Sequence, residues 1–286
     1  MKNFLLITNP LKEKSKENAE LIVEILRRNG CNCTAALFPR ENPNGGNYLY
    51  TNPDKVPQDT EAVITLGGDG TFIHALKDLI SLNLPVFGVN FGTLGYLTEV
   101  EVSGFEGALQ AVCRGEYEIE NRMMMSYRIY HESIMSHEGL VLNDIAINRS
   151  LDTGIAELYV AVDGHFLNSY SADGIILSTP TGSTGYNLSA GGPLVLPTAQ
   201  VILVTPICAH TLNSRSIVLP ADVEVEIISR ARSRERARLD FVTIDGEKGI
   251  RLASGDVVKA CKAEVTSKII RVNKAGFIKN LRREMR

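Results

Sequence analysis

The feature that most constrains the fold is a strand, a glycine-rich turn and a helix that follow one another directly. Residues 62–66 are apolar and partly β-branched, and the next five residues are Gly67, Gly68, Asp69, Gly70 and Thr71. Apolar residues then recur at helical spacing, at Phe72, Ala75, Leu76, Leu79 and Leu82. The glycines permit positive φ and close approach of a ligand, and the free N–H groups that begin a helix suit a phosphate. The sequence therefore predicts an anion-binding turn.

Asp69 is unexpected in a turn that binds only phosphate, because a carboxylate repels an anion. We therefore predict that Asp69 acts on a proton, a sugar hydroxyl or a metal ion. The alternative is an ordinary strand-to-helix turn in which Asp69 is the N-cap of the helix. Both interpretations place a helix directly after the glycines.

The composition predicts a soluble protein that binds neither nucleic acid nor membranes. The chain has 286 residues, 44% of them hydrophobic, and a formal net charge of −3, so it has no general attraction for polyanions. The longest apolar stretch, residues 194–208, is interrupted by Pro197 and Pro206. The N-terminal residues lack the features of a secretory signal, and the five cysteines form no Cys-x-x-Cys pair. We expect cytoplasmic localisation and reduced thiols.

The first 117 residues have the pattern of alternating strands and helices that is typical of α/β domains. Strands are predicted at 4–8, 33–38, 62–66 and 84–90, and helices at 15–28 and 105–113. Residues 39–57 are rich in Pro, Asn and Gly and predict a long loop. Two glycines and two aromatic residues, the last of them Tyr96, follow the strand at 84–90. Open α/β sheets bind ligands at such strand ends.

From residue 118 onward the pattern changes to short alternating strands. They are predicted at 124–130, 140–148, 156–162, 174–178, 201–205, 223–228 and 241–244. The dipeptides Asp163-Gly164 and Asp245-Gly246 predict hairpin turns. We therefore predict an all-β domain over residues 118–267. A tail, residues 268–286, is expected to return to the first domain with a short strand and a basic helix.

A run of glycines and hydroxyl-bearing residues around Tyr186 is the second feature that indicates a ligand. Residues 171–193 read SADGIILSTPTGSTGYNLSAGGP. Small hydrogen-bonding groups and one aromatic face suit a nucleotide base and its sugar. The alternative is a turn whose Ser and Thr side chains bond to their own backbone.

These motifs together give the chain a family resemblance. With the glycine turn, the Asn143-Asp144 pair, the segment 173–193 and the residues TPICAH at 205–210, the sequence resembles the NAD kinase family over nearly its whole length. The glycine turn alone is shared with lipid kinases and phosphofructokinases, whereas its combination with STPTGSTGY is specific. The resemblance implies a Rossmann-like α/β N-terminal domain, an all-β sandwich-like C-terminal domain and a site in the cleft between them.

The resemblance also implies a reaction and its participants. The terminal phosphoryl group of ATP, or of polyphosphate, would pass to the 2′-hydroxyl of the adenosine ribose of NAD, which gives NADP. A divalent cation, Mg²⁺ or Mn²⁺, is expected with the nucleotide, although no metal-binding residues of the protein are identified. A homodimer or homotetramer is implied. A related lipid or sugar kinase and a non-catalytic dinucleotide sensor remain as alternatives.

Site residues follow from the resemblance position by position. Asp69 would orient or deprotonate the hydroxyl, with Gly68 and Gly70 beside the pyrophosphate and with His74 and Tyr96 nearby. Asn143 and Asp144 would hold ribose hydroxyls, although the family has Glu where this chain has Asp144, and Asp173 would accept from the nicotinamide carboxamide. The residues that would frame adenine and its ribose are Thr184, Gly185, Tyr186, Asn187, Leu188 and Ser189. Ser171 stands where several family members have Arg, so acceptance of NADH stays open. Glu247 stands where members often have Gln.

Overall fold

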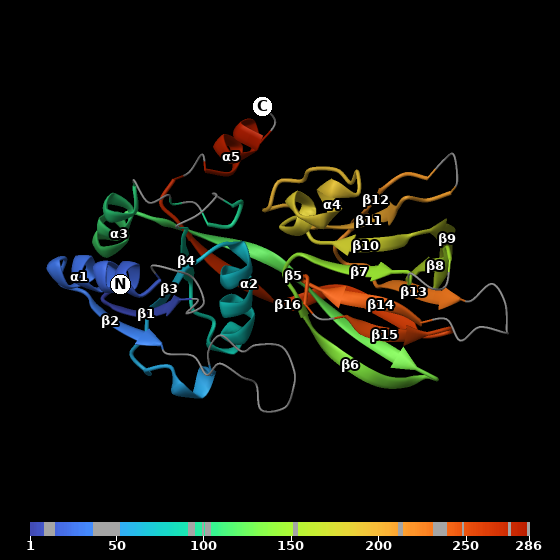
Figure 1. Cartoon of the computed structure of the whole chain (residues 1–286), viewed down its shortest axis with the longest axis horizontal. Coiled ribbons are helices and arrows are strands. Elements are labelled where there is room, and N and C mark those ends of the chain that lie inside the picture. The colour runs from blue at the N-terminus through green and yellow to red at the C-terminus, as the bar shows by residue number, and fades with distance from the viewer. Residues whose placement is uncertain are drawn as a thin grey trace. The chain divides into compact units, whose positions relative to one another are not determined.

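The chain folds into two compact units (Figure 1). The computed structural model describes residues 1–8, 15–36, 52–90, 95–98, 100, 104–150, 154–210, 214–230, 239–247, 249–273 and 276–284. The first unit comprises residues 1–121 and 267–286, and the second comprises residues 122–266. The long loop predicted at 39–57 lies outside the described residues up to residue 51, and so do residues 91–94. None of the described helices is long and apolar enough to cross a bilayer.

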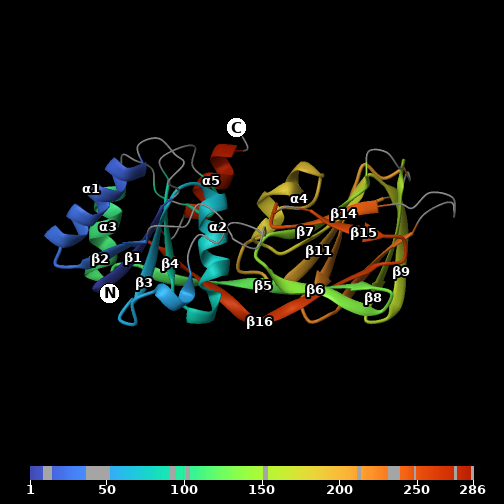
Figure 2. The same cartoon turned by 60° about the horizontal axis from the view of Figure 1, so that its bottom comes forward.

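The first unit is a parallel sheet with helices on both faces. Its strand order is β2-β1-β3-β4 followed by the end of β16, and these pairs are parallel. The strands are β1 (Asn3–Thr8), β2 (Asn32–Ala36), β3 (Ala62–Leu66), β4 (Val86–Val89) and β16 (Val257–Arg271). The helices are α1 (Ser15–Arg28), α2 (Asp69–Asp78), α3 (Phe105–Arg114) and α5 (Gly276–Glu284), with short 3₁₀ turns at Pro53–Lys55 and Ile80–Leu82. Helices α1 and α3 lie on one face of the sheet and α2 on the other (Figure 2).

This topology places the glycine turn where ligands bind in open α/β sheets. The chain passes from β1 to β2 in one direction across the sheet and from β3 to β4 in the other. The carboxyl ends of β1 and β3 therefore flank the point at which the strand order reverses. Every residue of β3 is buried, as expected for a strand covered on both faces, and Gly67 follows it directly.

The second unit consists of two sheets that pack face to face. One sheet has the order β12-β11-β10-β7-β14-β15, and the other includes β16, β13, β8 and β9 together with the β5–β6 hairpin. The strands are β5 (Glu118–His131), β6 (Ile134–Val141), β7 (Asp144–Asn148), β8 (Ala156–Val162), β9 (His165–Ala172), β10 (Gly174–Ser178), β11 (Val201–Ile207), β12 (Ile217–Pro220), β13 (Val225–Arg230), β14 (Leu239–Ile244) and β15 (Ile250–Ala253). Side chains of both sheets, such as Leu177 and Leu158, form one core. The predicted sandwich-like architecture is confirmed.

Both Asp-Gly dipeptides are hairpin turns, as predicted. Asp163 and Gly164 have φ of 49° and 77°, and Asp245 and Gly246 have φ of 50° and 74°. Positive φ at both central residues is typical of the turn that matches the twist of a β-hairpin.

The predicted strand pattern is incomplete, because it lacks β9, β12, β15 and most of β6 and β16, and it merges two strands into one. The sequence does not predict β9, most of whose residues are exposed, because an exposed edge strand shows no apolar face. The single strand predicted at 140–148 is in fact two strands, β6 and β7. The chain divides there because the backbone N–H groups of Leu142 and Asn143 donate to the Asp245 carboxylate.

Candidate active site

The glycine turn has an extended backbone, and helix α2 begins inside it. Gly68 precedes the helix with φ −86° and ψ −176°, and Asp69 is the first helical residue. Gly67, Gly68 and Gly70 do not adopt the positive φ that glycine permits. The alternative that Asp69 is the N-cap is wrong, because Gly68 takes that position. Steric crowding explains why residue 67 is a glycine, since a Cβ there would lie 2.5 Å from the Oγ1 of Thr71. A Cβ at Gly70 would contact no atom of the described residues within 4 Å, so the start of α2 is open on that side.

The carboxylate of Asp69 is held by the segment 95–98. Its Oδ2 accepts from the backbone N–H of Tyr96 at 3.0 Å and of Leu97 at 3.3 Å. Its Oδ1 accepts from the N–H of Thr98 at 3.1 Å and from the Thr98 hydroxyl at 2.9 Å. The Thr98 hydroxyl in turn accepts from the Nδ2 of Asn90 at 3.1 Å, and both residues are buried. Four donors thus fix the orientation of the carboxylate at the carboxyl end of β3.

The C-terminal tail supports the same segment. Arg271 is buried at the end of β16, and its Nη1 donates to the carbonyl oxygen of Leu97 at 3.1 Å. The ring of Tyr96 lies 6.1 Å from that of Phe277 in α5, centroid to centroid. His74 is half-buried on the second turn of α2. The first unit therefore brings Asp69 and Tyr96 together at the glycine turn.

In the second unit, the hydroxyl-rich segment folds into a 3₁₀ turn at Gly182–Thr184 and the short helix α4 (Tyr186–Ser189). Several of its hydroxyl groups point inward: Thr179 donates to the carbonyl of Leu142 at 2.5 Å, and Ser183 to that of Val195 at 3.2 Å. Within the turn itself, the N–H of Gly182 donates to the Thr179 hydroxyl at 3.2 Å and the Thr184 hydroxyl donates to the carbonyl of Thr181 at 3.4 Å, as in the self-bonding alternative. Among the residues expected to frame adenine and its ribose, those left half-buried or exposed are Thr184, Gly185, Tyr186, Leu188 and Ser189.

Asn187 differs from the other residues expected to frame adenine, because its side chain is buried. Its Nδ2 donates to the carbonyls of Ser183 at 3.3 Å and Pro193 at 3.1 Å, and its Oδ1 accepts from the Thr205 hydroxyl at 2.7 Å. A Cβ at Gly192 would lie 2.2 Å from that Oδ1. The amide of Asn187 therefore holds the shape of its own segment.

Asn143 and Asp144 lie at the start of β7, next to this segment. A Cβ at Gly182 would lie 2.2 Å from the carbonyl oxygen of Asn143, and one at Gly185 would lie 3.8 Å from the Oδ2 of Asp144. The Oδ1 of Asn143 is buried and has no hydrogen-bond partner among the described residues, which indicates a place for a donor from a ligand. Asp144 is 6% exposed, and this burial, followed by the charge of Asp245, raises its pKa to about 7. Its carboxyl group can hold or release a proton near neutral pH.

Asp173 and Tyr186 extend the group of polar residues along β7. The Oδ1 of Asp173 accepts from the Nε of Arg149 at 2.6 Å, and the Tyr186 hydroxyl donates to the Oδ1 of Asn148 at 3.2 Å. Burial, followed by the charges of Asp144, Cys208 and Asp173, raises the pKa of Tyr186. Asp144 begins β7 and Arg149 directly follows it, so their backbones are about 16 Å apart at about 3.3 Å per strand residue. That length suits an extended ligand better than a single sugar.

Ser171 and Glu247 lie at the margins of this group. The Ser171 hydroxyl donates to the Oε1 of Glu157 at 2.7 Å. Glu247 is half-buried after the Asp245-Gly246 turn, and its N–H donates to the carbonyl of Ile244 at 2.9 Å. The sequence motifs include neither Arg149 nor Thr98. The position of Asp245 at a strand end could have indicated a functional residue. Its Asp-Gly dipeptide is explained equally well by a hairpin turn, so the sequence did not single it out.

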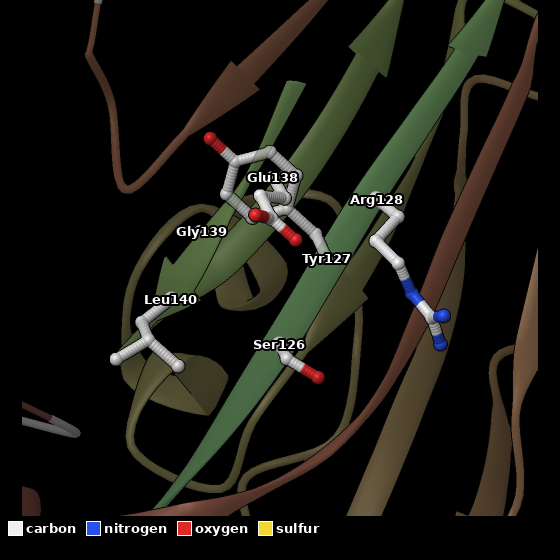
Figure 3. Close-up of a pocket in the computed structure, with 6 residues that line it drawn as sticks. All are labelled: Ser126, Tyr127, Arg128, Glu138, Gly139 and Leu140. Carbon is white, nitrogen blue, oxygen red and sulfur yellow. The ribbon is translucent and has the colours of Figure 1, made fainter. Parts of the chain in front are cut away.

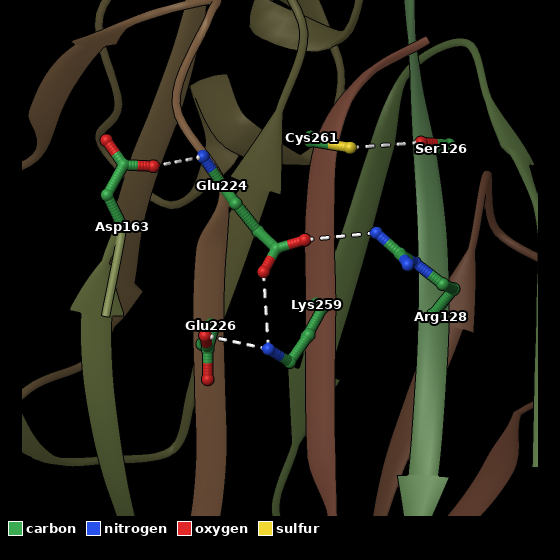
Figure 4. A network of polar contacts seen from close by, with 7 residues as sticks. All are labelled: Ser126, Arg128, Asp163, Glu224, Glu226, Lys259 and Cys261. Atoms are coloured by element: carbon green, nitrogen blue, oxygen red, sulfur yellow. Dashed lines mark hydrogen bonds and ion pairs between the residues drawn. The ribbon is translucent and has the colours of Figure 1, made fainter. Parts of the chain in front are cut away.

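A pocket of about 470 Å³ on the β5–β6 hairpin contains none of the expected site residues. Its lining consists of Ser126, Tyr127, Arg128, Glu138, Gly139 and Leu140 (Figure 3). The carboxylate of Glu224 joins one of them, Arg128 at 3.0 Å, to Lys259 at 3.2 Å (Figure 4). These ion pairs are partly exposed, and such pairs contribute little to stability. The pocket is not the candidate active site.

Comparison with known protein families and sequences gives matches along the whole chain. The family description "ATP-NAD kinase N-terminal domain" matches residues 4–117, and "ATP-NAD kinase C-terminal domain" matches residues 142–272. A relative from Lachnospira eligens named NAD kinase is 39% identical over 294 residues, covering 100% of both chains. Another NAD kinase, from Lachnoclostridium phytofermentans, is 38% identical over 284 residues, covering 99% of this chain and 98% of the relative.

Solved structures share the fold. Yeast NADH kinase complexed with NADH gives a TM-score of 0.84 at 23% identity, covering 100% of this chain and 87% of that one. An NAD kinase from Archaeoglobus fulgidus in complex with ATP gives a TM-score of 0.76 at 23% identity, covering 98% and 97%. The predicted two-domain fold is thus confirmed. Because both domain families match and the relatives align from end to end, this chain belongs to the NAD kinase family.

Proposed function

We propose that this chain transfers the terminal phosphoryl group of ATP to the 2′-hydroxyl of the adenosine ribose of NAD and releases NADP. The observation that carries the proposal is the end-to-end similarity to relatives named NAD kinase. The solved neighbours complexed with NADH and with ATP support a dinucleotide and ATP as ligands. The same assay tests whether polyphosphate can replace ATP as the phosphoryl donor and whether NADH can replace NAD as the acceptor.

In the first unit, we propose Asp69 as the group that aims the acceptor hydroxyl. Phosphoryl transfer through a loose transition state depends on positioning more than on a strong base, and the four donors on Asp69 hold it rigidly. A carboxylate has about four lone-pair directions, so the substrate hydroxyl takes the place of one donor. Gly68 and Gly70 are proposed to lie beside the phosphates, and the open space at Gly70 supports access to the start of α2. His74 and Tyr96 are proposed to contact the phosphates and the nucleotide at the margin of the turn.

In the second unit, we propose that Asn143 and Asp144 bind ribose hydroxyls. The unpartnered Oδ1 of Asn143 supports this role, because a ribose hydroxyl can donate to it. Asp173 is proposed to accept from the nicotinamide carboxamide with the oxygen that Arg149 leaves available. Thr184, Gly185, Tyr186, Leu188 and Ser189 would line the adenosine, while Asn187 keeps their segment in shape. Ser171 and Glu247 would contact the dinucleotide at the edge of the site.

A divalent cation is proposed to enter the site on ATP. Among the described residues, no three His, Cys, Asp or Glu side chains are grouped to hold a metal ion. We propose that the triphosphate carries the cation, with Asp69 as the nearby carboxylate. Once bound, the cation neutralises charge on the transferring phosphoryl group. Chelation with EDTA should stop NADP formation, and added Mg²⁺ should restore it.

The decisive experiment is an NADP-forming assay with the purified chain. ATP, Mg²⁺ and NAD are supplied, and NADP is measured with an NADP-specific dehydrogenase, in parallel with polyphosphate as donor and NADH as acceptor. NADP formation supports the proposal. Phosphorylation of a lipid or sugar without NADP would establish the related-kinase alternative. Tight NAD binding without turnover would establish the dinucleotide sensor.

Assembly and localisation belong to the same proposal. We infer a homodimer or homotetramer in the cytoplasm, as expected for the family. Light scattering coupled to size-exclusion chromatography would measure the mass of the particle against the 31.3 kDa of one chain. Cell fractionation would test the localisation, and a monomeric or membrane-associated protein would contradict these two inferences.

A further inference from the structure

The turn between β14 and β15 holds the start of β7 through one carboxylate. The Oδ1 of Asp245 accepts from the backbone N–H of Asn143 at 2.7 Å and of Asp144 at 3.2 Å. Its Oδ2 accepts from the N–H of Leu142 at 3.1 Å, and the Asp245 N–H donates to the carbonyl of Asp144 at 2.9 Å. Four hydrogen bonds therefore join the turn to three consecutive residues.

These bonds explain why the backbone leaves the strand ladder at this point. Three successive N–H groups turn toward one carboxylate instead of toward a neighbouring strand, and hydrogen bonds to an ionised acceptor are stronger than neutral ones. Asp245 has a φ of 50°, a conformation that Asp and Asn adopt more readily than other residues with a Cβ. An Asn at residue 245 would therefore keep the turn while losing the charge and one acceptor oxygen.

We propose that Asp245 is a positioning residue for the dinucleotide, which fixes the backbone of residues 142–144 so that the side chains of Asn143 and Asp144 face the ribose. This inference rests on the proposed function, since it assigns the ribose to those two side chains. The buried Oδ1 of Asn143 supports it, because an acceptor is presented where a ligand can pair with it. Asp245 itself acts through the backbone that it holds.

The charge of Asp245 provides a second effect that an ordinary turn residue would lack. Asp245 faces Asp144, and its negative charge adds to burial in raising the pKa of Asp144 to about 7. Among the described residues, Tyr186 also interacts with Asp144, whose charge contributes to the raised pKa of Tyr186. Removing the charge at residue 245 lowers the pKa of Asp144, although burial still holds it above its ordinary range. The pH dependence of dinucleotide binding should then move to lower pH.

The other Asp-Gly turn offers a matched control. Asp163 has a φ of 49°, its Oδ1 accepts from the N–H of Glu224 at 2.9 Å, and its own N–H donates to the Glu224 carbonyl at 2.9 Å. The residue type, conformation and reciprocal bonding thus repeat those of Asp245. The backbone that Asp163 holds is that of Glu224, which is not among the proposed site residues.

The experiment compares Asp245→Asn with Asp163→Asn in the full chain. The Asp245→Asn variant should raise the KM for NAD about 10-fold, because hydrogen bonds to a charged group are lost where the ribose binds. The pH at which this KM changes should shift downward. The Asp163→Asn variant should keep both quantities within about 2-fold of the parent chain. A lower folded fraction alone reduces kcat and leaves KM unchanged, so the KM separates positioning from folding.

A second variant provides a test if Asp245→Asn does not fold. Asp144→Asn keeps the Asp245 carboxylate and removes the titrating group, so the change in KM near pH 7 should disappear. Persistence of that change would show that Asp144 is not the titrating group, and it would overturn the pH effect assigned to Asp245. Equal KM values and pH profiles for Asp245→Asn and Asp163→Asn would overturn the positioning role.

Failure of the proposed function has a different signature. It would appear in the parent chain as absence of NADP formation, with or without NAD binding by calorimetry, before either variant is compared. A parent chain that binds and phosphorylates NAD, with the two variants alike, would refute the role of Asp245 alone.

Discussion

The backbone of Gly95 lies against the carboxylate of Asp69, so closely that a Cβ on residue 95 would lie 2.1 Å from the Asp69 Oδ1. The two residues come from different strand ends, since Asp69 follows β3 and Gly95 follows β4. Their contact allows Asp69 to accept from the three consecutive N–H groups of residues 96–98. The position of the proposed catalytic carboxylate therefore depends on a glycine 26 residues away along the chain.

We expect Gly95→Ala to disturb Asp69 while preserving the fold. The new methyl group must displace the carboxylate or the segment, so kcat for NADP formation should fall at least about 10-fold. Gly107→Ala is the matched control, because a Cβ there contacts no described atom within 4 Å and the residue lies inside α3. That control should raise stability by about 0.5–1 kcal/mol and leave activity unchanged. Full activity in Gly95→Ala would show that the Asp69 position does not matter.

Replacing Asp69 by Asn should separate chemistry from binding. The amide removes the negative charge that aims the hydroxyl, and the loss of a group that handles the reacting proton typically lowers kcat about 10²–10⁴-fold. NAD binding, measured by calorimetry, should change little. The exposed Asp59 in the same unit supplies the control, Asp59→Asn, which should retain full turnover. Normal turnover in Asp69→Asn would refute the role assigned to Asp69.

Asn187→Ala tests whether this residue holds its segment. The substitution leaves the carbonyls of Ser183 and Pro193 and the Thr205 hydroxyl without the partner they now have. We expect the free energy of unfolding to fall by about 2–4 kcal/mol, measured by urea denaturation. Ser189→Ala, at an exposed position of the same segment, should change stability by less than about 0.5 kcal/mol. Equal stability of the two variants would contradict a structural role for Asn187.

The buried carboxyl group of Asp144 should cost stability at neutral and alkaline pH. Its pKa is raised from 3.8 to about 7 in the folded chain, so between these values the folded state binds more protons than the unfolded state. The free energy of unfolding therefore falls as pH rises through this range and levels off above about pH 7. In Asp144→Asn this contribution is absent, and the variant should gain on the order of 2–4 kcal/mol relative to the parent chain between pH 4 and pH 8. A difference that stays constant over that range would contradict the raised pKa.

Local sequence determined the secondary structure around both motifs. The boundaries predicted for the central strand and for the helix at 15–28 match β3 and α1, because continuous apolar runs and helical periodicity are properties of short segments. The two Asp-Gly turns were equally predictable, since few residues tolerate positive φ. The resemblance to the NAD kinase family also required only the residues themselves.

The contacts of the site residues required the folded chain. Asp69 accepts from residues 96–98, and Asp245 from residues 142–144, over separations that no local pattern encodes. Asn187 and Tyr186 are neighbours in one hydroxyl-rich segment, yet the first is buried and the second exposed. The sequence by itself determined which residue types and backbone conformations were available. The tertiary structure decided which of those groups meet, because hydrogen bonding and burial depend on distances between segments that only packing brings together.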